Sequence, residues 1–212
     1  MRILDRRTAL ATALAAAGVV SAPAWAARPN WPAAPGDMSL GDPKAKVRVV
    51  EYLSLSCPHC AHFNETVFPA FKAAYVDKHR VYYTVRELLT PPANVAAAGF
   101  LIARRVGPGG YFAVVDEVFR SQSRWGAEPI RPILLEIAIK HGLTEVQFEA
   151  CLTDEQALAA LDDRIKYAIE VDKVDSTPTF FVNGARLLGQ QVPTLADLAA
   201  AVAKAAKTGR KA

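Results

Sequence analysis

A buried strand that runs directly into a closely spaced cysteine pair is the feature that most constrains this fold. Residues 46–53 (KVRVVEYL) are β-branched and apolar, which is typical of a buried strand. Ser56 follows, then Cys57-Pro58-His59-Cys60; serine is a favoured helix N-cap, and proline is favoured in the first helical turn. The cysteine motif is therefore expected to open a helix that continues to about Asp77 and bends near Pro69.

The remaining pattern predicts a small mixed sheet interrupted by a block of helices. Residues 80–87 (RVYYTVRE) alternate like a second strand, and Asn183-Gly184 is a strong hairpin signal between residues 179–182 and 185–188. The predicted helices are 94–106, 111–124, 129–141, a segment capped by Thr144 and Gln147, 154–171, and, after the hairpin, 194–206. This order gives an α/β domain whose sheet is covered by helices and which carries an all-helical insertion at about 93–172.

The first 26 residues have the three parts of a secretion signal. A basic segment at 1–7 precedes an uncharged apolar stretch at 9–20, and Ala24-Trp25-Ala26 offers the small residues that a signal peptidase reads. An N-terminal helix packed on the protein is the alternative, and it explains these features less well. Arg6-Arg7 leaves both the general secretory and the twin-arginine route open. We expect a signal peptide at 1–26, an extended lead-in at 27–40 and the folded domain at 41–212.

The charge of the chain is too small to indicate nucleic acid binding. The formal net charge is +4, and the predicted signal contributes three arginines against one aspartate, so the rest of the chain is only mildly basic. Hydrophobic residues make up 51% of the sequence, which is enough for one globular domain with a proper core.

The two cysteines have the spacing and location of a reversible redox pair. At a helix N-terminus the unpaired N–H groups and the helix dipole favour the thiolate of Cys57 over its thiol. Cys60 lies one turn further on, close enough to form a disulfide, so we expect Cys57 to form the mixed disulfide with a partner and Cys60 to resolve it. Pro58 and His59 tune the pair. A protonated His59 adds positive charge beside Cys57, which favours the reduced form and makes the disulfide a stronger oxidant.

Three alternative roles for these cysteines stay open at this point. A structural disulfide would close a loop too short to constrain the unfolded chain. A metal site lacks the distant second cysteine pair that usually completes one, and we expect no metal. Its candidate ligands are Cys57, His59, Cys60 and His62, completed by Cys151, His79 or His141. Two reduced cysteines without a role fit poorly with export. Cys151 lies among apolar residues of a helical segment and is expected to be a small buried hydrophobe.

A second segment, Thr177 to Gly184 (TPTFFVNG), stands at a distance from the motif that matches a known family. Together with Cys57-Pro58-His59-Cys60, the strand that contains Glu51, and Phe63, it resembles the DsbA family of periplasmic thiol:disulfide interchange proteins. The likeness covers most of the chain beyond the predicted signal, on both sides of the helical insertion. It implies a thioredoxin-like fold, in which a mixed sheet is flanked by helices, and a redox-active disulfide. We expect no cofactor.

The resemblance also implies roles for residues outside the cysteine pair. Pro178 matches the family's cis-proline opposite the motif, and the backbone of Thr177 is expected to pair with a bound peptide like an added strand. Glu51 matches a buried acid that handles the proton of Cys60; by itself it has the pattern of a strand-end charge facing water. Two positions depart from the best-known oxidases. Thr177 stands where they have valine, and the lysine that partners the acid is not matched, with Tyr82 near its place.

The sequence thus predicts an exported, periplasmic thiol:disulfide oxidoreductase that introduces disulfides into other exported, unfolded polypeptides. The resemblance implies reoxidation by a quinone-linked membrane protein. Only about twenty residues separate the predicted cleavage site from the first strand, too few for the dimerisation domain of disulfide isomerases, so we expect a monomer. The alternatives are a reductase or isomerase of the same fold, and a peptide-binding chaperone or metal-binding protein on this scaffold.

Overall fold

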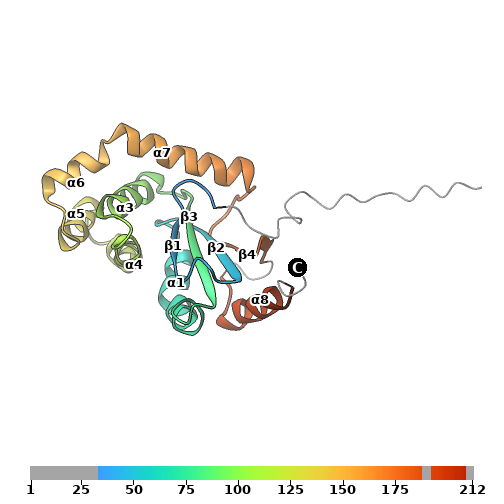
Figure 1. Ribbon diagram of the computed structural model, residues 1–212. Helices are drawn as coiled ribbons and strands as arrows, with labels where there is room; N and C mark the ends of the chain where they lie inside the picture. The colour runs from blue at the N-terminus through green and yellow to red at the C-terminus, as the bar shows by residue number, and fades with distance from the viewer. Residues whose placement is uncertain (1–32, 188–191, 209–212) are drawn as a thin grey trace, which may run out of the picture.

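The computed structural model describes residues 33–187 and 192–208, which form one sheet with helices packed around it (Figure 1). The sheet has five strands in the order β1-β3-β2-β4-β5. They are β1 (Met38–Leu40), β2 (Val47–Leu53), β3 (Val81–Glu87), β4 (Thr179–Val182) and β5 (Ala185–Arg186). β2 and β3 are parallel and the other neighbouring pairs are antiparallel, so the sheet is mixed, as the sequence predicts.

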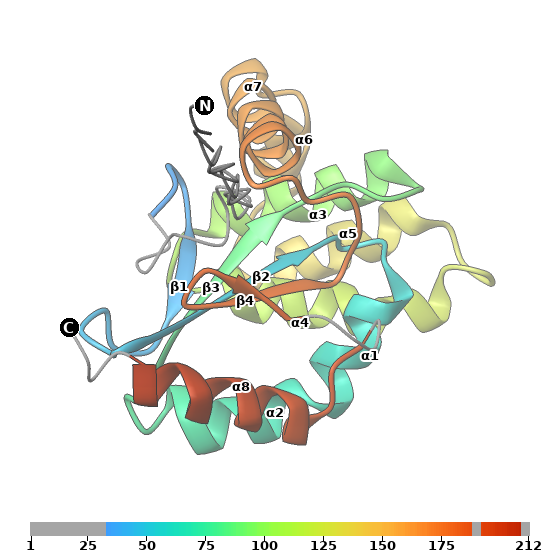
Figure 2. The same ribbon diagram turned by 90° about the vertical axis from the view of Figure 1, so that its right-hand side faces the viewer.

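β2 is the central strand, which explains the apolar run in its sequence. It pairs with β3 on one side and β4 on the other, and a strand covered on both faces needs apolar residues on both. The helices that follow it, with the one that closes the chain, are α1 (Pro58–Thr66), α2 (Phe68–Phe71), a π-helical turn (Lys72–Val76) and α8 (Leu195–Thr208). Figure 2 shows α2 and α8 side by side along the sheet. The break between α1 and α2, at Val67, confirms the bend predicted near Pro69.

The helical block follows β3 and extends to one side of the sheet in Figure 1. It consists of α3 (Ala93–Val106), α4 (Tyr111–Ser121), a 3-10 turn (Gln122–Arg124), α5 (Ile130–Lys140), α6 (Glu145–Leu152), α7 (Glu155–Lys166) and a π-helical turn (Tyr167–Val171). The predicted capping box of α6 is confirmed. The hydroxyl of Thr144 accepts from the N–H of Gln147 at 3.2 Å, and the side chain of Gln147 accepts from the N–H of Thr144 at 2.9 Å.

Residues 38–40, which the sequence assigns to the extended lead-in, form an edge strand instead. β1 pairs antiparallel with β3, and the hydroxyls of Ser39 and Thr84 lie 2.8 Å apart in a hydrogen bond. Three residues are too few for an alternating pattern to show, so the sequence gives no sign of this strand. The predicted signal at 1–26 lies outside the described residues. Within those described, no helix is both long and apolar enough to cross a membrane.

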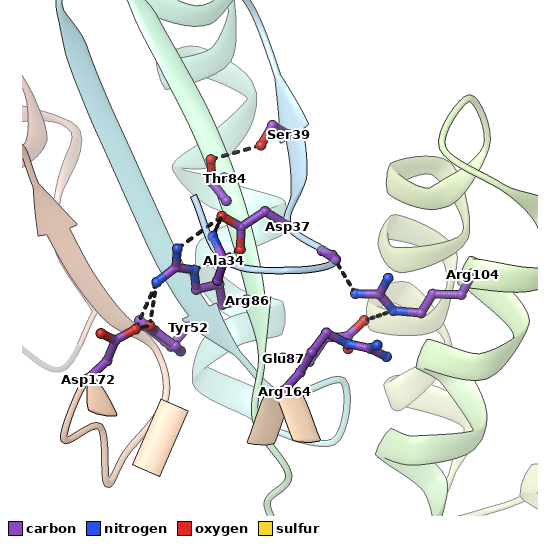
Figure 3. A network of polar contacts seen from close by, with 11 residues as sticks. Ala34, Asp37, Ser39, Tyr52, Thr84, Arg86, Glu87, Arg104, Arg164 and Asp172 are labelled. Carbon is purple, nitrogen blue, oxygen red and sulfur yellow. Dashed lines mark hydrogen bonds and ion pairs between the residues drawn. The ribbon is translucent and has the colours of Figure 1, made fainter. Parts of the chain in front are cut away.

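A buried carboxylate at the end of β3 joins the helical block to the sheet (Figure 3). The side chain of Glu87 is fully buried, and it accepts hydrogen bonds from Arg104 of α3 and Arg164 of α7, each at 2.6 Å. The hydroxyl of Tyr111, at the start of α4, donates to the same carboxylate at 3.1 Å. One carboxylate therefore holds three helices of the block against the strand.

The neighbouring Arg86 ties two further segments to the sheet. Successive strand residues face opposite sides, so Arg86 lies on the other face of β3 from Glu87. It donates to Asp37, in the segment before β1, at 2.8 and 2.9 Å, and to Asp172, after the last helix of the block, at 2.7 Å (Figure 3). Tyr52 of β2 also donates to Asp172.

Candidate active site

Cys57 occupies the N-cap of α1, just beyond the end of β2. Its backbone is extended, with φ −81° and ψ 119°, and Pro58 takes the first helical position as the sequence predicts. Pro58 and His59 are exposed, whereas only 5% of Cys57 is accessible. Its Sγ lies 3.4 Å from the carbonyl oxygen of Thr177. Cys57 is therefore almost completely covered, and its sulfur lies beside the segment that the resemblance assigns to peptide binding.

The prediction that Ser56 caps α1 is wrong. The N-cap is Cys57, and no side chain caps the helix. The hydroxyl of Ser56 instead donates to the carbonyl of Thr90 at 2.6 Å and lies 3.1 Å from the hydroxyl of Ser54. The N–H and the hydroxyl of Thr90 both donate to Ser54 Oγ at 3.0 Å. These bonds fasten the turn that precedes Cys57 to the loop that follows β3.

The pKa of the Cys57 thiol is lowered to about 5. The largest cause is a hydrogen bond from the thiol of Cys60, burial opposes it, and the backbone N–H groups of Cys60 and His59 lower the pKa further. These N–H groups are among those that a helix leaves unpaired at its start. At neutral pH Cys57 is therefore a thiolate, the form of cysteine that attacks disulfides.

Cys60 has the opposite character. It is completely buried, and its pKa is raised well above the usual range of a thiol. Burial is the largest cause, followed by the hydrogen bond that it makes to Cys57 and by the negative charge of Glu51. Both cysteines are free in the structure. The pair thus combines a reactive thiolate near the surface with a protonated thiol beneath it.

Glu51 of β2 is buried, so it is not a strand-end charge facing water. It lies close enough to Cys60 to affect that residue's pKa. The hydroxyl of Tyr83 on β3 donates to its carboxylate, and the ring of Phe68 packs on Tyr83 with 4.8 Å between centroids. Burial raises the pKa of Glu51 to about 8; the Tyr83 hydrogen bond opposes this, and the charge of Cys57 adds to it. The carboxyl is therefore mainly protonated at neutral pH.

The tyrosine that hydrogen-bonds to Glu51 is Tyr83. The resemblance places its neighbour, Tyr82, near the position of the family's lysine, and so does not identify Tyr83. Because successive residues of a strand face opposite sides, Tyr82 lies on the other face of β3. There the guanidinium of Arg48 is 5.1 Å from its ring centroid. A position in sequence does not fix the register of two strands, and here Val49 of β2 is opposite Tyr83.

We expect the disulfide form of the protein to lose stability as the pH rises, because of Glu51. In that form Cys57 does not titrate, so its charge does not act on Glu51. Burial, which is the largest cause of the raised pKa, still holds the pKa of Glu51 above its unfolded value of 4.5. An acid with a raised folded pKa contributes stability that is complete below the unfolded pKa and is lost as the pH rises through the folded one. Glu51→Gln should therefore flatten the dependence of the unfolding free energy on pH between 5 and 8, measured by urea titration.

The matched control for this experiment is Glu65→Gln, which removes an exposed carboxylate from α1. It should keep the slope of the wild-type protein. A Glu51→Gln protein with that same slope would show that Glu51 is not the group that titrates.

Thr177 and Pro178 form the opposite side of the site. Their peptide bond is cis, as the resemblance implies, and it leads directly into β4. Thr177 is buried, with its carbonyl oxygen directed at Cys57. The bond between Pro91 and Pro92 is also cis, which the sequence did not suggest. The cysteine pair, the cis-proline and Glu51 thus meet at one end of the central strand.

A family model described as Thioredoxin matches residues 33–204, which include the sheet, the cysteine pair and Pro178. This chain belongs to the thioredoxin family. Within that family it resembles DsbA proteins. The crystal structure of Wolbachia pipientis alpha-DsbA1 has a TM-score of 0.75 at 25% identity, covering 84% of this chain and 94% of that one. Bacillus subtilis BdbD has a TM-score of 0.72 at 21% identity, covering 84% and 97%, and supports the fold. The predicted resemblance and the thioredoxin-like fold are confirmed.

Curated relatives of this thioredoxin-family chain carry names from disulfide chemistry. A Rickettsia bellii protein named protein-disulfide oxidoreductase is 33% identical over 150 residues, which is 70% of this chain and 57% of the relative. A Bacillus cereus protein named for disulfide bond formation, protein D, is 29% identical over 153 residues, 69% of each chain. This chain therefore spans little more than half the length of the rickettsial relative.

The structure also tests the alternative metal site and the role of the third cysteine. Across residues 33–187 and 192–208, no group of three or more His, Cys, Asp or Glu side chains is placed to hold a metal ion. Cys151 of α6 is 5% exposed, and its thiol donates to the carbonyl of Phe148 at 3.1 Å. Burial raises the pKa of Cys151. It is a small buried residue of the helical block, as its sequence context predicts.

Proposed function

We propose that this protein is a thiol:disulfide oxidoreductase that works through Cys57 and Cys60. The asymmetry of the pair carries the proposal, because a stabilised thiolate lies at the helix start and a buried thiol lies one turn further in. A stabilised thiolate lowers the free energy of the reduced form, so the disulfide is readily given away. This favours an oxidase that introduces disulfides into exported polypeptides. The names of the relatives support the same chemistry.

Exchange takes two steps and moves two electrons from the client to the protein. A client thiolate attacks Sγ of Cys57 in the Cys57–Cys60 disulfide; a client–Cys57 bond forms, and Cys60 leaves as a thiolate and takes up a proton. A second client thiolate then attacks the client sulfur of the mixed disulfide, and Cys57 leaves as a thiolate. The client gains a disulfide, and the protein is left with two reduced cysteines.

Glu51 supplies the proton that Cys60 takes up. Its carboxyl is mainly protonated near neutral pH and is near enough to influence the pKa of Cys60. The hydrogen bond from Tyr83 holds the carboxyl in place without adding a charge beside it. When the pair is oxidised again, the same carboxylate can take the proton from Cys60.

Clients bind as extended segments beside Thr177 and Pro178. The carbonyl of Thr177 lies 3.4 Å from Sγ of Cys57, so a segment paired with this backbone would bring its own cysteine to the reactive sulfur. Backbone pairing needs no particular side chain, which suits unfolded polypeptides as clients.

Repeated turnover needs an oxidant for the reduced pair, and we assign that role to a quinone-linked membrane protein. Disulfides persist outside the cytoplasm, and the predicted signal at 1–26 would direct the chain to the periplasm. The protein would act there as a monomer.

The reduction potential of the couple distinguishes an oxidase from a reductase. We expect the Cys57–Cys60 couple, equilibrated in glutathione buffers, to lie near about −120 mV, the oxidising end of the range for such proteins. A value near about −270 mV would identify a reductase and overturn the assigned direction. The Cys151→Ser variant is the background for this titration, so that the third thiol does not contribute.

A further inference from the structure

The side chain of Gln122 connects the helical block directly to the turn that carries Cys57. Gln122 begins the 3-10 turn at the end of α4. Its Nε2 donates to the carbonyl of Leu55 at 2.8 Å and to the carbonyl of Cys57 at 3.4 Å. The two ends of these hydrogen bonds are more than sixty residues apart in the chain.

Both carbonyls belong to the part of the backbone that sets the direction of α1. The carbonyl of Cys57 also accepts from the N–H of Ala61 at 3.1 Å, the first main-chain hydrogen bond of the helix. Leu55 is fully buried, and a buried carbonyl needs a donor. The amide of Gln122 therefore completes the hydrogen bonding of the active-site turn from outside the turn.

The position of Gln122 is fixed because α4 is attached to the sheet domain along its length. Tyr111, at the start of α4, donates to Glu87 of β3 at 3.1 Å. In the middle of the helix, Asp116 accepts from the side chain of Asn64 on α1 at 2.8 Å. At the end of the helix, Ser121 accepts from the indole of Trp125 at 3.0 Å, a local bond that holds the turn of Gln122 together. α4 thus connects the Glu87 carboxylate, at its start, to the active-site turn, at its end.

We propose that Gln122 is a positioning residue that holds the carbonyls of Leu55 and Cys57 and so keeps the first N–H groups of α1 directed at Cys57 Sγ. The proposal rests on the function proposed above. The N–H groups of His59 and Cys60 bond to that sulfur, and their direction depends on the backbone dihedrals of Cys57. Holding these dihedrals stabilises the thiolate and, with it, the reduced form of the couple.

The test measures the pKa of Cys57 and the equilibrium of the couple with glutathione in Gln122→Ala, Gln122→Glu and the control Ser123→Ala. Ser123 is exposed, and its hydroxyl bonds only to the carbonyl of Arg120 among the contacts described, so its loss should move neither quantity. In Gln122→Ala we expect a higher pKa and an equilibrium less oxidising by about five-fold, the effect of one ordinary hydrogen bond. Gln122→Glu should shift both further, because a carboxylate then faces two carbonyls and a thiolate.

The pKa is obtained from the rate of alkylation of Cys57 against pH in a Cys151→Ser background. If both Gln122 variants are less stable to urea but keep the Cys57 pKa and the equilibrium of the control, Gln122 is merely structural and the proposal is overturned. If Gln122→Ala does not fold, the nearly isosteric Gln122→Glu decides the same question. A wild-type protein that fails to exchange with glutathione would overturn the proposed function instead, and the alkylation measurement would still test Gln122.

Discussion

Replacing Cys57 with serine is expected to abolish thiol exchange, whereas replacing Cys60 with serine should leave Cys57 able to form a mixed disulfide. A serine hydroxyl forms no disulfide, so turnover should fall by at least about a thousand-fold, the scale on which enzymes suffer from loss of their nucleophile. In Cys60→Ser the serine can still donate a hydrogen bond to the Cys57 thiolate. That thiolate can attack a disulfide, but the variant has no second cysteine to resolve the mixed disulfide that forms on Cys57. We expect this variant to accumulate a mixed disulfide with oxidised glutathione, measured by mass spectrometry.

The control for these two variants is Cys151→Ser. Cys151 is buried in α6 and bonded to the carbonyl of Phe148, so its replacement should leave the rate of exchange unchanged. Normal exchange by Cys57→Ser would show that Cys57 is not the nucleophile. In Cys60→Ser, a glutathione adduct on Cys151 in place of Cys57 would show the same.

The cysteine site could be predicted because the signals for it are local or shared with a family. The helix start at Cys57-Pro58 depends only on residues adjacent in the sequence, because proline is favoured at the first helical position whatever the surrounding fold. The same holds for the hairpin turn, where Asn183 has φ 45° and Gly184 has φ 81°, values that these two residue types tolerate best. Glu51 shows the opposite case. Its burial is a property of the sheet, and only the resemblance pointed to it.

Contacts between distant segments could not be predicted from the sequence. The Tyr83 hydroxyl meets Glu51 only in one register of two parallel strands, and a shift of one residue would present Tyr82 instead. Gln122 reaches the turn at Leu55 only because α4 packs along α1. Glutamine on a helix end has no pattern of its own that indicates such a contact.

The elements of the fold divide in the same way: those with a repeated sequence pattern could be predicted, and those that depend on single contacts between distant segments could not. The seven residues of β3 and the helices of eleven or more carry enough repeats for their period to show, and β2 has a β-branched apolar run; all were predicted. The three residues of β1 carry too few. The Arg86-Glu87 pair was placed at the end of a strand, where charges usually face water, yet both side chains are buried. Their partners come from segments that sequence periodicity does not bring together.

Replacing Glu87 with alanine is expected to produce the largest loss of stability of the substitutions considered. The variant removes a carboxylate whose side chain is fully buried and leaves Arg104 and Arg164, with side chains 19% and 17% exposed, without their counter-charge. Breaking a buried ion pair in this way typically costs about 3–5 kcal/mol, because a charge stays desolvated without compensation. Glu87→Gln should lose less, because its amide oxygen can still accept from one arginine. Urea titration of the unfolding free energy measures both.

Glu128→Ala is the matched control, because Glu128 also pairs with an arginine, Arg124, but at the surface. Water and salt screen such a pair, so its loss should change the unfolding free energy little. The three partners of Glu87 come from α3, α4 and α7, and the destabilisation should therefore be greatest in the helical block. Amide hydrogen exchange in Glu87→Ala should accelerate more in α7 than in α8, which packs on the other side of the sheet domain beside α2. Equal losses for Glu87→Ala and Glu128→Ala, or uniform acceleration of exchange, would show that the block is held to the sheet by its apolar contacts and not by this carboxylate.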